Sequence, residues 1–290
     1  MISKYLQEPG IPYSGYDTFC EPFFGGGAMM IHIYKNNPSC KRFIINDINK
    51  EIMGIYSAIK YDVHGFIYRM DELQQQYLPL SKEDRKVFYY ALREQYGTNW
   101  KQWTPTEESA TLYFLMKTGF NGIWQTNKQS NGRFGTPSGL LNQKDTVYDK
   151  ENVLEWNVFL KKATLYSDDW KKCTKYTEGK TFFFMDPPYR GSFTSYDQTF
   201  NDDQQVELIE FCVNRSLAGD AVMYCNRDVG DDFYIQHKAH LDISYYDVTY
   251  TAGRRKQTKE EDGSISHSAK KAKEILLHSN VRTSRNILDL

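Results

Sequence analysis

The sequence predicts an α/β fold in which a parallel sheet is interrupted by a helical insertion in the second quarter of the chain. Three observations predict it. Short apolar runs alternate with helical stretches near both ends, the region from about 51 to 119 is helical, and turns rich in glycine or proline follow the apolar runs. The chain has 290 residues, 40% of them hydrophobic, which suits one large domain or one with an insertion.

The first strands lie near the N-terminus. The apolar run Thr18 to Phe24 is typical of a strand that ends at Gly25-Gly26-Gly27, and a helical stretch follows it. Arg42 to Asn46 is a second buried strand, followed at once by Asp47. Two apolar strands separated by a short helix predict a βαβ unit with parallel strands.

The middle of the chain carries helix start signals. Ser81 precedes Asp84 by three residues, and Thr104 with Glu107 has the spacing of a capping box with a proline at the first helical position. The stretch from 120 to 139 then consists mainly of Asn, Gly, Ser, Thr and Pro, which excludes regular structure. A loop of this length inside a compact chain is more often functional than not.

Strands and helices alternate again toward the C-terminus. We expect strands at 180–186 and 221–226, a helix at 202–217 opened by Asn201, and a terminal antiparallel pair at 243–250 and 274–279 joined by a long polar loop.

Composition narrows the function classes. The formal net charge is -1, so a nucleic-acid partner would need local basic patches, and the 15% of aromatic residues fit either a Tyr-rich core or platforms for bases. The five cysteines form no C-x-x-C pair, so we expect reduced thiols and no metal site. No apolar run approaches the ~20 residues of a membrane span, and we expect a soluble, cytoplasmic protein.

The glycine turn suggests a ligand pocket. Three glycines let a backbone approach a ligand closely, but the run is GGGAMM, which lacks the third spaced glycine of a dinucleotide fingerprint, and no P-loop Lys-Ser or Lys-Thr follows. Asp47, at the end of the second strand, is placed to accept hydrogen bonds from a ribose diol. A structural turn followed by a helix-capping aspartate explains these residues equally well.

The turn Asp186-Pro187-Pro188-Tyr189 carries a more specific signal. Two prolines end the preceding strand and fix the backbone that follows. An aspartate carboxylate and a main-chain carbonyl can accept the two hydrogens of an aromatic exocyclic amine, and the tyrosine ring can stack on the base. Such a site methylates through positioning and electrostatics, without a metal or a covalent enzyme intermediate.

With these motifs the sequence resembles the Dam-like family of DNA adenine N6-methyltransferases, the D12 class with the alpha motif order. The resemblance rests on EPFFGGGAM, IINDIN, FLMKTGFNGIWQTN with GRFGTP, MDPPY, and YTAGRRKQTKEEDG with AKEILL, which together span nearly the whole chain. It implies a Rossmann-like, seven-stranded methyltransferase sheet with a helical target-recognition insertion. We expect a catalytic domain at 1–58 and 148–290 and a DNA-binding domain at 59–147.

The resemblance also implies a site-specific enzyme that transfers a methyl group from S-adenosylmethionine to N6 of a flipped-out adenine. The implied catalytic residues are Asp186, Pro187, Pro188 and Tyr189. The implied cofactor-binding residues are Lys4, Glu21, Pro22, Phe23, Gly25, Gly27, Asp47, Asp169 and Asp186. The implied DNA-binding residues are Phe120, Asn121, Trp124, Gln125, Asn127, Lys128, Arg133, Pro137, Arg254, Arg255 and Lys256.

Two features bear on how DNA is bound. Gln125 stands where GATC-specific members of the family carry an arginine that reads guanine, and glutamine suits adenine better, which argues against a GATC site. Basic residues cluster in the last polar loop and fit phosphate contacts, or simply a solvated hairpin. The resemblance favours a role for Phe120 as a wedge, a ring inserted into the duplex beside the flipped adenine. Trp124 fits either such a wedge or an anchor that packs the loop against the core of the insertion.

Other functions stay open at this stage. N4-cytosine methylation uses the same amine chemistry, but a serine at position 186 would favour it. Methylation of RNA or of protein glutamine is a third interpretation, and a DNA-binding protein that has lost activity is a fourth. For the favoured enzyme we expect double-stranded DNA as partner, a monomer or a dimer on DNA, a bacterial or phage-infected host, and a role in restriction–modification or as an orphan methylase.

Overall fold

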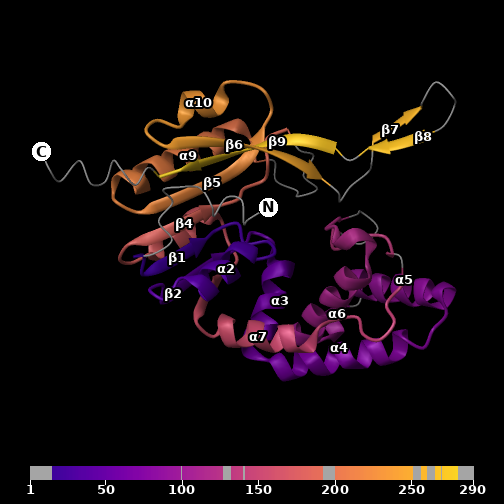
Figure 1. The fold of residues 1–290 in the computed structure, drawn as a ribbon. Coiled ribbons are helices and arrows are strands. Elements are labelled where there is room, and N and C mark those ends of the chain that lie inside the picture. Colours follow the sequence, from indigo (N-terminus) through magenta and orange to yellow (C-terminus); the bar gives the residue numbers. More distant parts are fainter. Residues whose placement is uncertain are drawn as a thin grey trace, which may run out of the picture. The chain divides into compact units, whose positions relative to one another are not determined.

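The computed structural model describes residues 15–98, 100–126, 132–139, 141–191, 200–250, 256–259, 265–268 and 270–279 (Figure 1). The chain divides into two compact units. Unit 1 comprises Met1–Asn46, Asp169–Thr194 and Gln198–Leu290, and unit 2 comprises Asp47–Asp168 with Ser195–Asp197. The limits expected from the sequence, after residues 58 and 147, stay a prediction.

A seven-stranded sheet confirms the predicted α/β fold. Its order is β3-β2-β1-β4-β5-β9-β6. β1 pairs in parallel with β2 and β4, and β4 with β5, whereas β9 is antiparallel to both β5 and β6. The strands are β1 (Thr18–Glu21), β2 (Arg42–Asn46), β3 (Ala163–Tyr166), β4 (Thr181–Met185), β5 (Ala221–Asp228), β6 (Asp242–Tyr250) and β9 (Lys270–His278).

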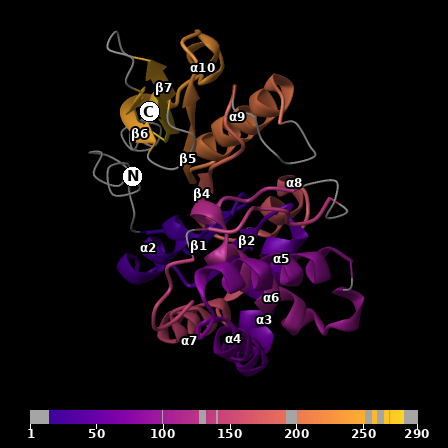
Figure 2. The same cartoon turned by 90° about the vertical axis from the view of Figure 1, so that its right-hand side faces the viewer.

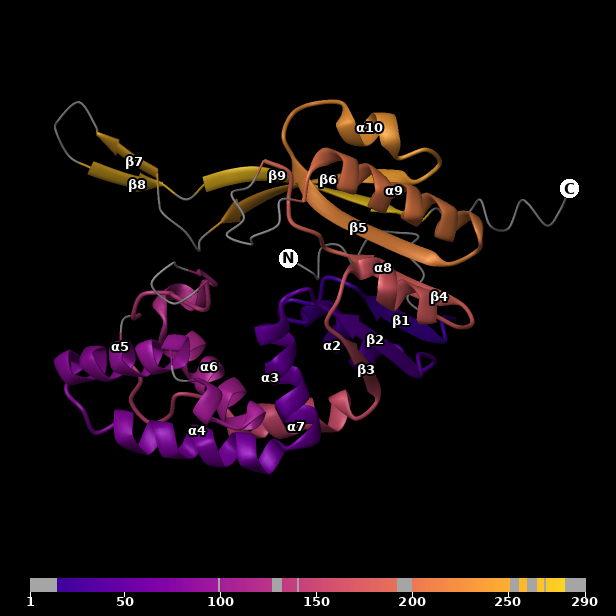
Figure 3. The ribbon, with the colours of Figure 1, turned by 180° about the vertical axis from the view of Figure 1, so that it is seen from behind.

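The centre of the sheet is apolar because helices cover both of its faces. Every residue of β1 and β4 is buried, as expected for parallel strands without a solvent face. In unit 1, α2 lies on one face, and α8, α9 and α10 lie on the other (Figure 3). These helices are α2 (Ala28–Asn36), α8 (Trp170–Cys173), α9 (Asp202–Leu217) and α10 (Phe233–His237).

α9 begins where the sequence predicts. The Asn201 side chain accepts a hydrogen bond from the Gln204 backbone, and the Gln204 side chain accepts one from the Asn201 backbone. This capping box fixes the helix start directly after the segment that carries the Asp-Pro-Pro-Tyr turn.

Unit 2 is mainly helical, with α6 packed against α3, α4 and α5 (Figure 2). The predicted capping box at Thr104 and Glu107 is present, with Pro105 at the start of α6. The predicted start at Ser81 is also present, because its hydroxyl accepts a hydrogen bond from the Asp84 backbone. The helices are α3 (Lys50–Tyr61), α4 (Val63–Tyr77), α5 (Lys82–Thr98), α6 (Pro105–Thr118) and α7 (Lys150–Leu160), with 3-10 turns η1 (Trp100–Gln102) and η2 (Phe120–Gly122).

Three local features differ from the expectations. β1 ends at Glu21 rather than Phe24, because Pro22 and the glycine turn leave the sheet. The polar loop between β6 and β9 contains a second small sheet, in which β7 (Lys256–Lys259) pairs antiparallel with β8 (Ile265–Ser268). α7 and β3 are elements that the sequence patterns did not predict.

Within the described ranges, no helix is long and apolar enough to span a membrane.

Candidate functional site

Two turns singled out from the sequence follow neighbouring strands of the unit 1 sheet. β1 and β4 are adjacent and parallel, with Cys20 opposite Phe183. The strand order reverses between them, because β2 lies beyond β1 and β5 lies beyond β4. In open α/β sheets, ligands bind at the carboxyl ends of strands at such a switch point. The glycine turn after β1 and the Asp-Pro-Pro-Tyr turn after β4 therefore share the edge where a ligand site is expected.

The turn after β1 has a fixed backbone and an open surface. The Phe24 backbone donates to the Asn46 carbonyl over 2.8 Å, and the Asn46 side chain donates to the Pro22 carbonyl over 2.9 Å. Gly25 and Gly27 have φ values of 46° and 64°, which L side chains rarely adopt. A Cβ built on Gly25 would meet no atom within 4 Å. The space on the Cβ side of Gly25 is thus open, and a ligand can approach the backbone there.

Three carboxyl groups surround the ends of the central strands. Asp186 follows β4, Glu21 ends β1, and Glu274 lies on β9; the last two are buried. All three raise the pKa of the buried Cys225 thiol on β5, after burial itself, which has the largest effect. The described residues contain no group of three or more His, Cys, Asp or Glu side chains that could hold a metal ion. The three carboxyl groups therefore lie close enough to the Cys225 thiol to act on its pKa.

Asp186 has a perturbed carboxyl group. Its side chain is exposed to solvent, yet the dense protein around it raises the pKa of the carboxyl to about 7 by desolvation. A hydrogen bond from Tyr189 lowers this pKa, and the charge of Glu274 raises it further. A carboxyl that titrates near neutral pH at a ligand edge is a marker of a functional site.

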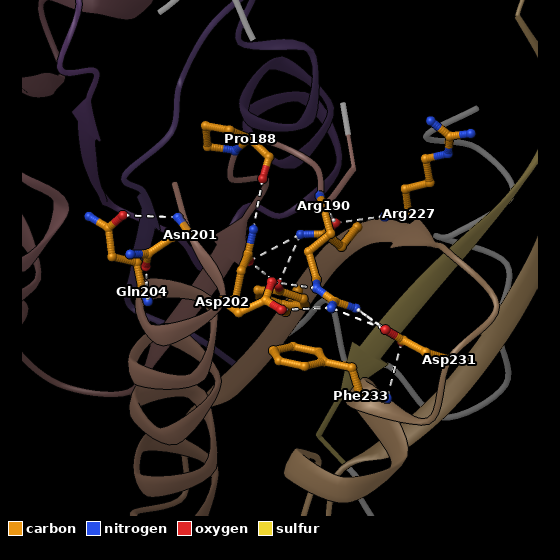
Figure 4. Close-up of polar contacts among 11 residues, drawn as sticks. Pro188, Arg190, Asn201, Asp202, Gln204, Arg227, Asp231 and Phe233 are labelled. Carbon is orange, nitrogen blue, oxygen red and sulfur yellow. Dashed lines mark hydrogen bonds and ion pairs between the residues drawn. The ribbon is translucent and has the colours of Figure 1, made fainter. Parts of the chain in front are cut away.

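The backbone after Asp186 is tied to α9 and β5. The Gln205 side chain donates to the Pro188 carbonyl over 2.8 Å, and the Arg190 backbone donates to the Asn226 side-chain oxygen over 2.9 Å. The Arg190 guanidinium also binds Asp202 over 2.8 Å and Asp231 over 3.0 Å (Figure 4).

Sequence reasoning did not single out these supporting residues. Arg190 directly follows the motif and looks like an ordinary charged residue. Asn226 leaves a weak signal, because it is a polar residue at the end of the apolar run Ala221–Cys225 and a buried polar group requires partners. Gln205 lies on a helix among polar neighbours, and its burial depends on the fold.

Two expected cofactor-binding carboxylates make local hydrogen bonds. Asp47 is half-buried directly after β2, and its Oδ1 accepts from the Asn49 backbone over 2.9 Å. Asp169 is exposed and accepts from the Lys171 backbone over 2.9 Å, as the N-cap of α8. Trp170 beside it is buried against Phe211, with ring centroids 5.3 Å apart. The structure thus gives Asp169 a capping role and Trp170 a core role.

The loop after α6 is ordered by backbone contacts around Thr136. The Thr136 hydroxyl donates to the Ile123 carbonyl over 2.7 Å and accepts from the Gln125 backbone over 3.2 Å. Tyr89 and Arg93 of α5 donate to the Thr136 carbonyl, both over 2.9 Å. This threonine, 1% exposed, is the internal support of the loop.

The loop presents several of the expected DNA-binding side chains. Phe120 is 43% exposed, and Gln125 and Pro137 are exposed as well. Asn121 is exposed, and its φ of 53° lies in the left-handed region. Trp124 packs against the buried ring of Phe134, with centroids 5.3 Å apart. Of the two roles open for Trp124, the packing favours the anchor.

Arg133, which the resemblance places among the DNA-binding residues, makes contacts within unit 2. Its guanidinium forms ion pairs with Glu51, at 2.8 Å, and with Glu108, and its side chain is only 15% exposed. It also lies over the Tyr96 ring, 4.1 Å from the centroid. Arg133 therefore ties the loop to the helices of unit 2, and we do not assign it to DNA.

Part of the basic region lies on described strands. Lys271 and Lys273 are exposed on β9, and the backbone of Lys256 begins β7. Five expected site residues lie outside the described residues: Lys4, Asn127, Lys128, Arg254 and Arg255.

Comparisons with known proteins show which family the chain is similar to. A family model described as D12 class N6 adenine-specific DNA methyltransferase matches residues 6–251. The chain is 32% identical over 231 residues to the type II methyltransferase M.MjaIII of Methanocaldococcus jannaschii, covering 78% of this chain and 77% of the relative. It is 29% identical over 203 residues to M.CviBI of Paramecium bursaria Chlorella virus NC1A, covering 68% and 69%. To the DNA adenine methylase of Escherichia coli it is 23% identical, covering 84% of each chain.

Proposed function

This chain belongs to the D12 class N6 adenine-specific DNA methyltransferases, and from that premise we propose how its residues divide the reaction. Asp186 and the Pro187 carbonyl bind the target amine, Tyr189 stacks on the base, and the turn after β1 holds the methyl donor. The observation that carries this assignment is that both turns follow adjacent parallel strands at the switch point of the sheet.

The target amine needs acceptors because its lone pair is delocalised into the ring. The Asp186 carboxylate and the Pro187 carbonyl can accept its two hydrogens and direct the lone pair toward the methyl group. Pro187 and Pro188 have no backbone N–H, so this turn presents carbonyl acceptors without competing donors. When the nitrogen gains the methyl group it becomes positively charged, and the adjacent Asp186 carboxylate stabilises that charge and can take up the released proton.

The residues of the first turn fit S-adenosylmethionine as donor. The space beyond Gly25 and Gly26, where a Cβ would meet no atom within 4 Å, admits a ligand against the backbone. Glu21 at the end of β1 and Asp47 directly after β2 are the acids that would accept hydrogen bonds from its amino and ribose groups. The bound sulfonium supplies an activated methyl group. Pro22 and Phe23 would shape the pocket wall beside these groups, and Asp169 is a weaker candidate because it caps α8.

Unit 2 supplies the proposed base-reading loop. Phe120, Asn121, Gln125 and Pro137 are exposed on a loop whose backbone is held by Thr136. A fixed backbone with exposed polar side chains suits direct reading of base edges. Gln125 offers one donor and one acceptor, which complements adenine, so we propose a recognition sequence other than GATC. Phe120 is the candidate wedge beside the flipped adenine.

The strands β6 to β9 supply the proposed phosphate contacts. Lys271 and Lys273 are exposed on β9, and Arg254, Arg255 and Lys256 precede or begin β7 in the sequence. Neutralising these last three together should weaken binding to every DNA sequence. It should also flatten the dependence of log K on log salt by about 0.9 for each phosphate that is no longer neutralised. A change in sequence preference at constant slope would make them base readers instead.

Asp186→Ala and Asp186→Asn test the catalytic assignment. Both should reduce methyl transfer by about 10²–10³-fold or more, because a preorganised acceptor is removed. Binding of S-adenosylmethionine and of a DNA duplex, measured separately by calorimetry and fluorescence anisotropy, should persist in Asp186→Asn. Turnover of either variant within threefold of the wild type would refute the assignment. Asp47→Ala should instead raise the KM for the cofactor with a modest loss of kcat.

A further inference from the structure

We propose that the buried residues Gln205, Tyr224 and Asn226 are positioning residues that fix the catalytic turn for methyl transfer. The inference rests on the proposed role of Asp186 and Tyr189, and it assigns the geometry of that site to a polar network behind it. Gln205 lies on α9, and Tyr224 and Asn226 lie on β5. All three are fully buried.

The network is continuous. The Tyr224 hydroxyl and the Asn226 Nδ2 both donate to the Gln205 Oε1, the second over 3.2 Å. Asn226 Nδ2 also donates to the Tyr224 hydroxyl oxygen over 2.9 Å. The remaining atoms of the two amides face the backbone of the turn. Gln205 Nε2 donates to the Pro188 carbonyl, and Asn226 Oδ1 accepts from the Arg190 backbone and, over 2.8 Å, from the Arg227 backbone.

The backbone partners fix the orientation of both amides. The Pro188 carbonyl is only an acceptor, so Gln205 must present its nitrogen there. The Arg190 and Arg227 N–H groups are only donors, so Asn226 must present its oxygen. Each residue can satisfy the turn in one orientation only, and that orientation leaves the complementary atoms facing each other.

The two contacts with the turn lie on either side of Tyr189. The Pro188 carbonyl precedes it and the Arg190 N–H follows it. Holding both peptide groups sets the direction of the Tyr189 Cα–Cβ bond, and with it the plane available to a stacked base. The prolines have no N–H with which the turn could anchor itself, so side chains from outside the turn must do so.

A second contact anchors the end of the turn at the surface. The Arg190 guanidinium lies between Asp202 and Asp231 and over the Phe233 ring, 3.8 Å from its centroid (Figure 4). The two aspartates are 62% and 48% exposed, and such pairs are screened by solvent and salt. The buried network is therefore the stiffer of the two anchors.

Burial of three polar side chains suggests a role beyond packing. Apolar residues of similar volume would fill the space between α9 and β5 without the cost of desolvating amides and a hydroxyl. The two amides instead bind backbone groups of the turn at Pro188 and Arg190, and a satisfied buried network makes its surroundings rigid. Displacement of reacting groups by about 1 Å can cost about 10²-fold in rate.

Gln205→Met tests the proposal, because it keeps the side-chain length and removes every hydrogen bond of the amide. We expect kcat to fall by about 10- to 100-fold while the KM for DNA and the affinity for S-adenosylmethionine stay within about threefold. Gln204→Met is the matched control, one residue earlier on α9. It breaks the capping box with Asn201 but leaves the turn untouched (Figure 4), so we expect it to lower the Tm without this loss of kcat.

Tyr224→Phe is the second variant, since it removes one buried hydroxyl and keeps the ring. We expect a smaller fall in kcat, again at constant KM, even if Gln205→Met does not fold. A kcat within threefold of wild type in each folded variant, or an equal fall in Gln204→Met, would overturn the proposal. Asp186→Asn, assayed in parallel, distinguishes failure of the proposed function from failure of the positioning role. If Asp186→Asn is active, the proposed function is wrong. If Asp186→Asn is inactive and the network variants are active, only the positioning role is wrong.

Discussion

Methyl transfer should lose rate as the pH falls through about 7. The perturbation is protonation of Asp186, whose pKa is raised to about 7 mainly by desolvation. Only the ionised carboxylate can accept from the amine with full strength and stabilise the positive charge that develops on the nitrogen. The acid limb of the rate profile therefore reports the ionisation of this side chain.

The magnitude follows from a single titration. With a pKa of about 7, roughly 9% of the carboxyl is ionised at pH 6 and roughly 91% at pH 8, so the rate should differ about tenfold between them. Tyr189→Phe keeps a ring for stacking but removes the hydrogen bond that lowers this pKa. The midpoint of its profile should therefore move to higher pH.

Single-turnover methyl transfer measures this directly. The rate is measured at DNA concentrations well below saturation, where it is proportional to kcat/KM and reports the ionisation of the free enzyme, and it is followed from pH 5.5 to 9 at constant ionic strength. The residual rate of Asp186→Asn should be independent of pH in that range. A flat wild-type profile, or a midpoint near 4, would refute the reasoning, and a downward shift in Tyr189→Phe would contradict the role of its hydroxyl.

Three further outcomes are expected. Asp186→Asn should raise the Tm more at pH 8 than at pH 5. The pKa of Asp186 is about 7 in the folded protein and about 3.9 in the unfolded chain, so ionisation of this side chain makes the wild type less stable as the pH rises toward 7. An equal rise in Tm at both pH values would argue against this. Gln125→Arg should move base preference toward guanine at one position by about 1–3 kcal/mol in methylation of random duplexes, and strict GATC methylation unaltered by the change would exclude a reading role. Arg133→Met should cost about 3–5 kcal/mol in chemical denaturation, because Glu51 and Glu108 lose their shared cation; unchanged stability with weaker DNA binding would restore the phosphate contact.

Local signals in the sequence predicted much of the fold. The capping boxes at Thr104 and Asn201 are present as expected, because a cap depends on residues within one helical turn. The apolar runs before Gly25 and Asp186 form central strands, because a short apolar run bounded by turn residues is typical of a buried strand. The two turns of the candidate site could therefore be located from the sequence alone.

Contacts between distant residues could not be predicted in the same way. Arg133 looks like any basic residue near a loop, and only the fold shows that Glu51, 82 residues earlier, binds its guanidinium. The hydrogen bonds of Gln205 and Asn226 could not be predicted either, because their partners lie on another element or in the turn. Trp124 fits a wedge or an anchor until the position of Phe134 is known.

The way the chain enters and leaves unit 2 has a consequence for folding. Thr18 of β1 pairs with Thr181 of β4, so the centre of the sheet forms only after about 160 intervening residues are closed into a loop. Unit 2 is almost continuous in sequence, and the Ser167 hydroxyl donates to the Asp47 carbonyl over 3.2 Å, which joins its two ends. If unit 2 folds first, the effective loop shortens to about 40 residues and its closure entropy falls by about 1.2 kcal/mol. The insertion would then favour pairing of β1 with β4, because it shortens the loop that this pairing must close.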